Sequence, residues 1–375
     1  MWVRSLQLHH YRNYKELDLS FSPGLNVVHG DNAQGKTNLL ESIYLLSTGK
    51  SHRTSRDAEL IMAGSNLLTA KASVMRQTGE MSLELTLGTE TRKQLRINGI
   101  TEQRIASLVG NLGSVFFSPD DLQLVKGAPA GRRRFLDIEI SQLSQTYLHH
   151  LIAYTKVMQQ RNTLLKREGV DRSLMEIYDQ QLVATGAQLI VRRAQSVARL
   201  SPLAATYHET LSSGREQLLL QYESQVVAND EPLTIPAAEE QLWRLLEQRR
   251  RDEMRRQITL VGPHRDDLQF QINGTDARLY GSQGQQRTAV LALKLAELQY
   301  MYEELGEYPV LLLDDVASEL DPHRRHFLLH AVREGVQTFV SCTDLEDLMV
   351  RTWPSDHALF QVQTGQVTEL EKGAL

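Results

Sequence analysis

The stretch Gly30-Asp31-Asn32-Ala33-Gln34-Gly35-Lys36-Thr37 has glycine, lysine and threonine at every fixed position of a phosphate-binding loop. The short apolar run Leu25 to Val28 precedes it and predicts a strand, and apolar residues then recur at helical spacing until Gly49. In such a unit, backbone N–H groups surround the β-phosphate, Lys36 reaches the β- and γ-phosphate oxygens, and Thr37 can hold Mg²⁺. The eight residues are therefore a candidate ATP-binding site, and Lys36 is also a candidate catalytic residue.

A second apolar run, Val310 to Leu313, ends in the two acids Asp314 and Asp315. An unbroken apolar run of this length is typical of a buried parallel strand. In ATP-hydrolysing proteins, the first acid after such a strand holds Mg²⁺ and the second can orient the attacking water. We expect Asp314 to join Thr37 as a metal residue and Asp315 to be catalytic.

The remaining sequence predicts an α/β protein with a helical insertion. Apolar and polar residues alternate from Leu67 to Ile100, where Asn98-Gly99 is a strong hairpin-turn signal, so we expect an antiparallel meander there. Strand-like runs return at 258–261 and 268–273 and are followed by a helical pattern from about 285 to 305. We expect residues 1–120 and 258–375 to build one ATPase lobe of mixed sheet, and residues 121–257, with helical runs at 143–166 and 174–200, to form a mainly helical second lobe.

Charge and cysteine content restrict the class of protein. The formal net charge is −5, which excludes a uniformly basic coat for nucleic acid but not a local basic face. Cys342 is the only cysteine, so no disulfide can form within one chain, in keeping with a reducing compartment. The first residues lack the apolar core of a signal peptide, and no apolar run is long enough for a transmembrane helix. We expect a cytoplasmic protein that does not interact with membranes.

Two further motifs resemble the ABC ATPase family, particularly its chromosome-maintenance branch. Ser282-Gln283-Gly284-Gln285 opens a predicted helix and is similar to the ABC signature, with Gln283 in place of the usual first glycine. Ser318-Glu319-Leu320-Asp321 is similar to the D-loop that follows the acidic strand. The resemblance implies an ABC-type P-loop ATPase head in which Ser282, Gly284 and Gln285 of one copy cap the γ-phosphate bound by the other copy of a head-to-tail dimer.

The motifs also resemble one narrower family, the RecF recombination-repair proteins of bacteria. The similarity includes the phosphate loop with the residues up to Glu41 and runs in order through the blocks 47–53, 116–122, 126–137 and 262–268. It implies an SMC-like protein without long coiled-coil arms that binds single-stranded and duplex DNA at gaps and dimerises on ATP. It further implies RecR and RecO as partners, loading of RecA, recovery of replication forks, support of the SOS response, and a weak, DNA-stimulated ATPase.

The chain departs from the resembled pattern in two places. Ser341-Cys342-Thr343-Asp344 stands where related heads carry a histidine that contacts the γ-phosphate. Asp315 stands where many relatives have glutamate, whose carboxylate reaches one methylene further, so we expect slow hydrolysis. Two other functions stay open: a P-loop small-molecule kinase, and an ABC-type adaptor head that binds ATP without hydrolysing it.

Arginine clusters are the candidates for contact with DNA phosphates, because guanidinium forks suit phosphate oxygens. The alternative is that they pair with neighbouring acids, so we assign no DNA-contacting residue. The polar run His264-Arg265-Asp266-Asp267 is similarly expected to be a turn network rather than a metal site. The clusters are 132–134, 192–193, 249–251 with 255–256, and 324–325.

Overall fold

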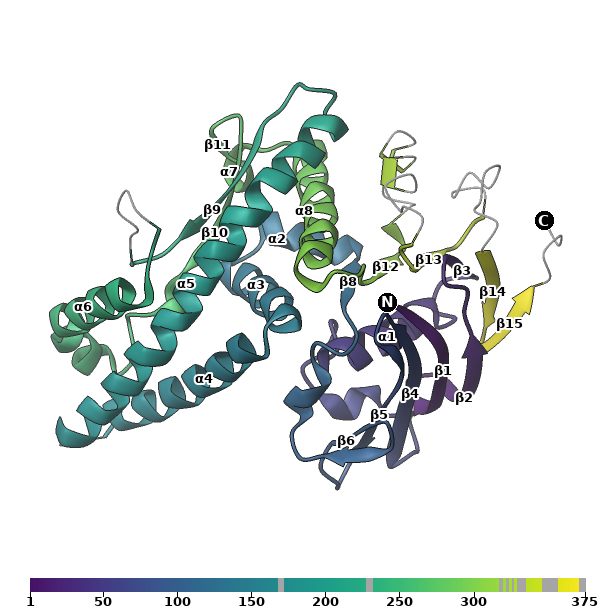
Figure 1. Cartoon of the computed structure of the whole chain (residues 1–375), viewed down its shortest axis with the longest axis horizontal. Coiled ribbons are helices and arrows are strands. Elements are labelled where there is room, and N and C mark those ends of the chain that lie inside the picture. Colours follow the sequence, from purple (N-terminus) through teal and green to yellow (C-terminus); the bar gives the residue numbers. More distant parts are fainter. Residues whose placement is uncertain are drawn as a thin grey trace. The chain divides into compact units, whose positions relative to one another are not determined.

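The computed structural model describes residues 1–167, 172–226, 232–316, 320–321, 324–325, 327–328, 335–345 and 357–370. The chain divides into two compact units, one made of Met1–Asp121 with Glu297–Leu375 and the other of Leu122–Ala296 (Figure 1). One boundary lies between residues 121 and 122. The other boundary lies inside helix α8 (Gln283–Leu305), and residues 267–272 pair with residues 218–223 of the helical unit.

The first unit contains a mostly parallel sheet that carries the phosphate loop and the acidic strand. Its strand order is β15-β14-β3-β13-β12-β8, and only the edge strand β15 runs antiparallel to its neighbour. The two strands predicted to lead into the nucleotide motifs are confirmed as β3 and β12, and neither is at an edge. The strands are β3 (Leu25–His29), β8 (Ser114–Phe117), β12 (Val310–Asp314), β13 (Thr338–Cys342), β14 (His357–Gln363) and β15 (Gln366–Leu370).

A second sheet in the same unit is antiparallel, with the order β2-β1-β4-β5-β6-β7. The predicted meander is confirmed, and Asn98 and Gly99 both have positive φ, as a two-residue hairpin turn requires. Short 3₁₀ segments, η1 (Asp57–Leu60) and η2 (Ile105–Leu108), connect its strands to the rest of the unit. The strands are β1 (Trp2–Tyr11), β2 (Tyr14–Ser20), β4 (Leu67–Arg76), β5 (Gly79–Gly88), β6 (Gln94–Ile97) and β7 (Ile100–Glu102).

Helix α1 (Lys36–Thr48) starts at the phosphate loop and shares one hydrophobic core with both sheets. A helix buried on all sides shows little amphipathic periodicity, and α1 buries both its apolar residues and Glu41. Glu41 accepts a hydrogen bond from Arg12 Nη2 at 2.8 Å, so the buried carboxylate is paired with a cation. The core therefore fixes α1, and with it the position of the loop.

The second unit is mainly helical, as expected. The predicted helical runs are confirmed as α4 (Gln145–Leu165) and α5 (Arg172–Leu211), which pack against each other (Figure 1). None of the helices in the described ranges is both long and apolar enough to cross a membrane. The other helical segments up to residue 265 are η3 (Pro119–Leu122), α2 (Gln123–Lys126), α3 (Pro129–Leu143), α6 (Ile235–Arg256) and η4 (Pro263–Arg265).

A small antiparallel sheet, in the order β11-β10-β9, completes this unit. It consists of β9 (Leu218–Glu223), β10 (Asp267–Ile272) and β11 (Thr275–Asp276), and α7 (Ala277–Tyr280) follows it. The predicted strand at 258–261 is wrong. There the Thr259 N–H donates to Asn162 Oδ1 at 2.7 Å and the Thr259 carbonyl accepts from Arg265 Nη2 at 2.8 Å, so side chains replace a strand partner.

Candidate ATP-binding site

The phosphate loop has the backbone geometry needed to surround an anion. Gly30 (φ +152°), Ala33 (φ 65°) and Gly35 (φ +126°) all have positive φ. Gly35 caps α1 without a side-chain hydrogen bond, and the first turn of α1 carries no acidic residue. The first N–H groups of a helix have no intrahelical acceptor, and the helix dipole favours negative charge there. This end of α1 therefore suits a phosphate group.

The Lys36 ammonium lies across the inside of this loop. Its Nζ donates to the carbonyls of Gly30 at 2.5 Å and Asp31 at 2.9 Å, and the residue is 7% exposed. Phosphate oxygens held by the loop would be stronger acceptors than these neutral carbonyls, because charge-assisted hydrogen bonds are roughly twice as strong. The residues thus fit the triphosphate group that the sequence predicts.

Two neighbouring turns hold the loop from outside, and sequence analysis missed both. From the β1–β2 turn, Asn13 Nδ2 donates to the Gln34 carbonyl at 2.7 Å and Tyr14 Oη donates to the Gly35 carbonyl at 2.9 Å. From the β14–β15 turn, the Thr364 N–H donates to Gln34 Oε1 at 2.6 Å. These contacts join residues far apart in sequence, so no local spacing could have revealed them.

Replacing Gly30 by alanine is expected to displace the loop and weaken ATP binding by at least tenfold. An added Cβ would lie 2.3 Å from the Val362 carbonyl oxygen, a backbone atom that cannot rotate away. Gly64→Ala is the matched control, since Gly64 also has positive φ (+84°) but no atom within 4 Å of its added Cβ. That control should lose only about 1–2 kcal/mol of stability from backbone strain. Calorimetric titration with ATP measures the effect, and equal affinities in both variants would contradict the steric argument.

Asp314 and Thr37 are brought together as the sequence predicts. Thr37 Oγ1 donates to Asp314 Oδ1 at 3.0 Å, and Ser341 Oγ donates to the same oxygen at 2.8 Å. Burial raises the pKa of Asp314, hydrogen bonds from Ser341 and Thr37 lower it, and the neighbouring Asp315 raises it further, leaving it above its ordinary value. One carboxylate and one hydroxyl are the kind of ligands with which Mg²⁺ is bound beside a triphosphate. The pair therefore fits the expected metal.

Ser341 is a site residue that the sequence analysis noticed only as a departure. Besides its bond to Asp314, its Oγ accepts the Asp315 backbone N–H at 2.9 Å. One hydroxyl therefore fixes both acids after β12. The strand pairing explains this placement, because β13 lies beside β12 in parallel with Ser341 opposite Asp314.

Asp315 has a left-handed backbone conformation, with φ 52°. Asparagine and aspartate tolerate this region better than other residues with a Cβ, because their short polar side chains can bond locally. A glutamate side chain is longer and would be less able to stabilise this left-handed backbone through a local hydrogen bond. The backbone conformation thus gives a physical reason for the shorter acid that the sequence carries.

The signature turn has the geometry of a capping box. The Ser282 N–H donates to Gln285 Oε1 at 2.8 Å, and the Gln285 N–H donates to Ser282 Oγ at 3.2 Å. The N–H groups of Gln283 and Gly284 are first-turn donors without intrahelical acceptors, and the nearest atom to a Cβ on Gly284 would be Ser282 Oγ at 3.9 Å. Ser282 Oγ accepts this one hydrogen bond, and its hydroxyl still has a proton that it can donate. The turn therefore offers a hydroxyl and backbone N–H groups of the kind that suit an anion, and Gln285 holds Ser282 in the capping box.

Part of the D-loop lies outside the described residues, namely Ser318 and Glu319. Of the remaining two residues, Asp321 accepts the Arg324 backbone N–H at 3.0 Å and pairs with the Arg324 guanidinium at 2.6 Å.

The run from His264 to Asp267 is a turn network, as predicted. His264 Nδ1 is 2.6 Å from Tyr154 Oη, and its Nε2 is 3.1 Å from the Thr259 carbonyl. Asp267 makes a bidentate pair with Arg132 at 2.6 and 2.7 Å, and Tyr222 donates to Asp266. These side chains hold helices and strands of the second unit together.

His264 is expected to make the second unit acid-sensitive. Burial lowers its pKa from 6.5 to about 4, while the Thr259 carbonyl partly opposes that shift. The folded state thus resists a proton that the unfolded chain takes up below pH 6.5, so stability is lost as the pH falls from 6.5 towards 4. Lowering the pH from 7.5 to 5.0 should cost about 2 kcal/mol through this group. Urea unfolding followed by helix circular dichroism at both pH values checks it. His264→Gln should show a loss smaller by about this amount, and an unchanged pH dependence would contradict the assignment.

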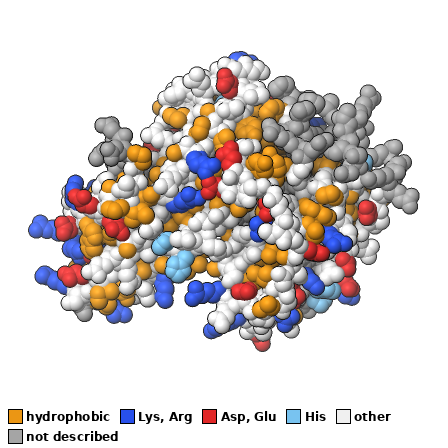
Figure 2. All heavy atoms as spheres, in the orientation of Figure 1, with side chains coloured by type: hydrophobic (Ala, Val, Ile, Leu, Met, Phe, Trp, Pro, Cys, Tyr) orange, Lys and Arg blue, Asp and Glu red, His pale blue; other side chains and the backbone are white. Residues whose placement is uncertain are grey.

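One arginine from each of two predicted basic clusters is buried in an ion pair. Arg132 is buried against Asp267, and Arg193 is buried against Asp137 at 2.7 Å. On the face shown in Figure 2, basic and acidic side chains are interspersed rather than gathered into one basic surface. Arg132 and Arg193 are therefore paired with acids inside the second unit.

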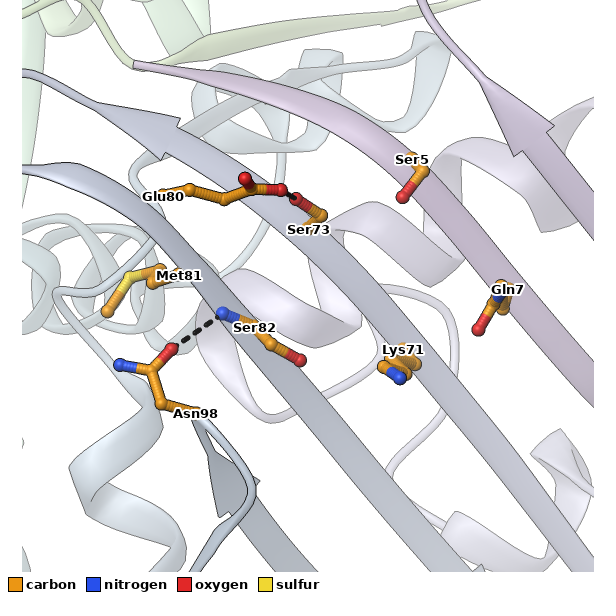
Figure 3. A pocket seen from close by; sticks show the side chains of 8 residues that line it. All are labelled: Ser5, Gln7, Lys71, Ser73, Glu80, Met81, Ser82 and Asn98. Atoms are coloured by element: carbon orange, nitrogen blue, oxygen red, sulfur yellow. Dashed lines mark hydrogen bonds between the residues drawn. The ribbon is translucent and has the colours of Figure 1, made fainter.

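A polar groove of about 440 Å³ lies on the antiparallel sheet (Figure 3). Its floor is a row of serines in register, Ser5 opposite Ser73 and Ser73 opposite Ser82. Lys71 and Gln7 line it from one side. None of the predicted site residues lines this groove.

Comparison with known proteins shows which families share this fold. Residues 2–367 match the RecF/RecN/SMC N-terminal domain family. A solved structure of the recombination mediator protein RecF with ATP, of the RecFOR pathway, superimposes with a TM-score of 0.91 at 34% identity, covering 99% of this chain and 98% of that one. An SMC head bound to the C-terminal winged-helix domain of ScpA shares the fold, with a TM-score of 0.57 at 15% identity, covering 100% of this chain and 98% of that one.

A curated relative shows the narrower family. The DNA replication and repair protein RecF of Symbiobacterium thermophilum is 62% identical over 373 residues, which cover the full length of both chains. With that identity along its whole length, and with a mixed α/β head fold of the RecF and SMC kind, the chain belongs to the RecF family of DNA replication and repair proteins.

Proposed function

We propose that the chain is an ATP-dependent DNA-binding protein of recombinational repair and replication-fork recovery. ATP binding would join two copies on single-stranded or duplex DNA at gaps, and slow hydrolysis would release them. Such a cycle uses ATP as a ligand that favours one of two states, because it binds the dimer more tightly than the separate chains.

The observation that supports this proposal is that two groups of residues each present donors that suit an anion. The loop from Gly30 to Thr37 would surround one side of a phosphate, and the Ser282 turn would offer a hydroxyl and two helix N–H groups to another. In the ABC heads that the chain resembles, these two sites of different copies bind one ATP. Ser282 and Gly284 would then contact the γ-phosphate of the partner's nucleotide.

Thr37 and Asp314 would hold Mg²⁺, and Lys36 would bind the β- and γ-phosphate oxygens. The metal would neutralise phosphate charge, while Asp315 would orient water for hydrolysis. These roles follow from the hydrogen bonds of Thr37 and Ser341 to Asp314 and from the position of Asp315 directly after it.

The partners follow from the family. The RecF structure bound to ATP belongs to a pathway named for RecF, RecO and RecR. We infer that this chain works with RecO and RecR to help load RecA, supports the SOS response, and acts in the cytoplasm.

Sedimentation velocity tests the proposal directly, with and without ATP and with and without gapped duplex DNA. ATP should convert the protein to a dimer, and DNA should increase the dimer fraction. A monomer under all four conditions would overturn the mechanism.

A further inference from the structure

The signature turn is tied to a carboxylate that no motif includes. Gln285 uses its amide oxygen for the Ser282 N–H and donates from its amide nitrogen to Glu216 Oε1 at 3.0 Å. Glu216 lies in the connection between α5 and β9, far from Ser282 in sequence. A single side chain therefore links this connection to the turn.

Glu216 is itself held in place. Its Oε2 is 3.1 Å from Nε2 of His208, which is fully buried near the end of α5. Its backbone N–H is 3.3 Å from Ser212 Oγ. The Glu216 side chain is 22% exposed, so its two contacts are partly protected from water. A chain of contacts thus runs from His208 through Glu216 and Gln285 to Ser282.

The carboxylate determines which way the Gln285 amide points. A carboxylate only accepts hydrogen bonds, so the NH₂ end of Gln285 must face Glu216 and the oxygen must face the Ser282 N–H. In that orientation the amide oxygen forms one half of the capping box, and the Gln285 backbone N–H forms the other half by donating to Ser282 Oγ. The Ser282 hydroxyl proton is then the group left to point at an anion. With the amide reversed, the NH₂ group would face the Ser282 N–H, and two donors would oppose each other.

We propose that Glu216 is a positioning residue for Ser282, and that it tunes the affinity of the signature turn for the γ-phosphate of a second copy. This inference rests on the proposed ATP-dependent dimer. Glu216 itself would not touch ATP. It would act by fixing the Gln285 amide, and His208 would keep the carboxylate in place.

Glu216→Ala tests this positioning role. ATP-dependent dimerisation, measured by sedimentation velocity across a protein dilution series, should weaken about tenfold for each shared site, the effect of one charge-assisted hydrogen bond. ATP affinity of the monomer, measured by titration calorimetry at low protein concentration, should stay unchanged because the phosphate loop belongs to the other unit. Glu216→Gln should restore dimerisation, since its amide oxygen can accept from Gln285. Dimerisation of Glu216→Ala equal to that of the native protein would overturn the inference, as would a Glu216→Gln protein as weak as Glu216→Ala.

Two controls separate positioning from general damage. Glu209→Ala removes an exposed acid next to His208 and should dimerise like the native protein. Gln285→Ala breaks the same link from the other side, so adding Glu216→Ala to it should weaken dimerisation no further. Full additivity of the two changes would contradict the link. Replacing Ser282 by arginine blocks the signature turn itself. If that Ser282→Arg protein still dimerises with ATP, the shared-site mechanism fails. If Ser282→Arg prevents dimerisation but Glu216→Ala does not, only the positioning role of Glu216 fails.

Discussion

Replacing Ser282 by arginine is expected to leave ATP binding intact and to abolish ATP-dependent dimerisation, with the dimer weakened at least a hundredfold. Arginine would fill the space at the turn where a partner's phosphate is to sit. It would also remove the oxygen that accepts the Gln285 N–H at 3.2 Å and so open the capping box. The phosphate loop belongs to the other compact unit and should keep its affinity. Sedimentation with ATP measures dimerisation, and calorimetry measures ATP binding by the monomer.

Two comparisons make this result specific. Thr163→Arg adds the same side chain at an exposed position of α4 and should dimerise normally. Lys36→Arg should show the opposite defect, with weaker ATP binding or turnover, because the longer planar fork cannot replace a compact ammonium inside the loop. A Ser282→Arg protein that still dimerises with ATP would refute the shared site.

The elements that sequence reasoning recovered are those with local causes. The phosphate loop follows from its glycines and from the change between strand and helix periodicity around it. The acidic strand follows from an apolar run ending in Asp314. In the helical unit, the long runs predicted α4 and α5 because helical spacing persists over many residues.

The contacts that sequence reasoning missed join distant segments. Ser341 reaches Asp314 only because β13 pairs beside β12, and Asn13 and Thr364 reach Gln34 only because two hairpin turns meet at the loop. Residues 258–261 have strand composition but bond to side chains of α4 and of the following turn. Apolar composition alone does not distinguish a segment whose backbone bonds to a neighbouring strand from a segment whose backbone bonds to side chains. Glu216 was missed for the same reason, since its partners come from α5 and α8.

Replacing Asp315 by asparagine is expected to reduce steady-state phosphate release about a hundredfold or more, the usual size of a general-base or water-orienting contribution. Asparagine keeps the shape of the side chain and tolerates the left-handed backbone at φ 52°, so only the charge is removed. The Asp315 N–H bond to Ser341 Oγ, at 2.9 Å, should persist because it is a backbone bond. ATP binding and dimerisation should therefore survive, and the dimer should last longer on DNA.

Phosphate release measured with and without gapped DNA decides between the remaining functions. Asp120→Asn, an exposed acid on the same unit, should have native turnover. Stimulation by DNA in the native protein and its loss in Asp315→Asn would favour an ATPase switch, because turnover would then depend on both the DNA and the carboxylate. Equal release by both proteins would mean that another group activates the water. No release by either would favour the non-hydrolysing adaptor head, and stimulation by a small metabolite instead of DNA would favour the kinase.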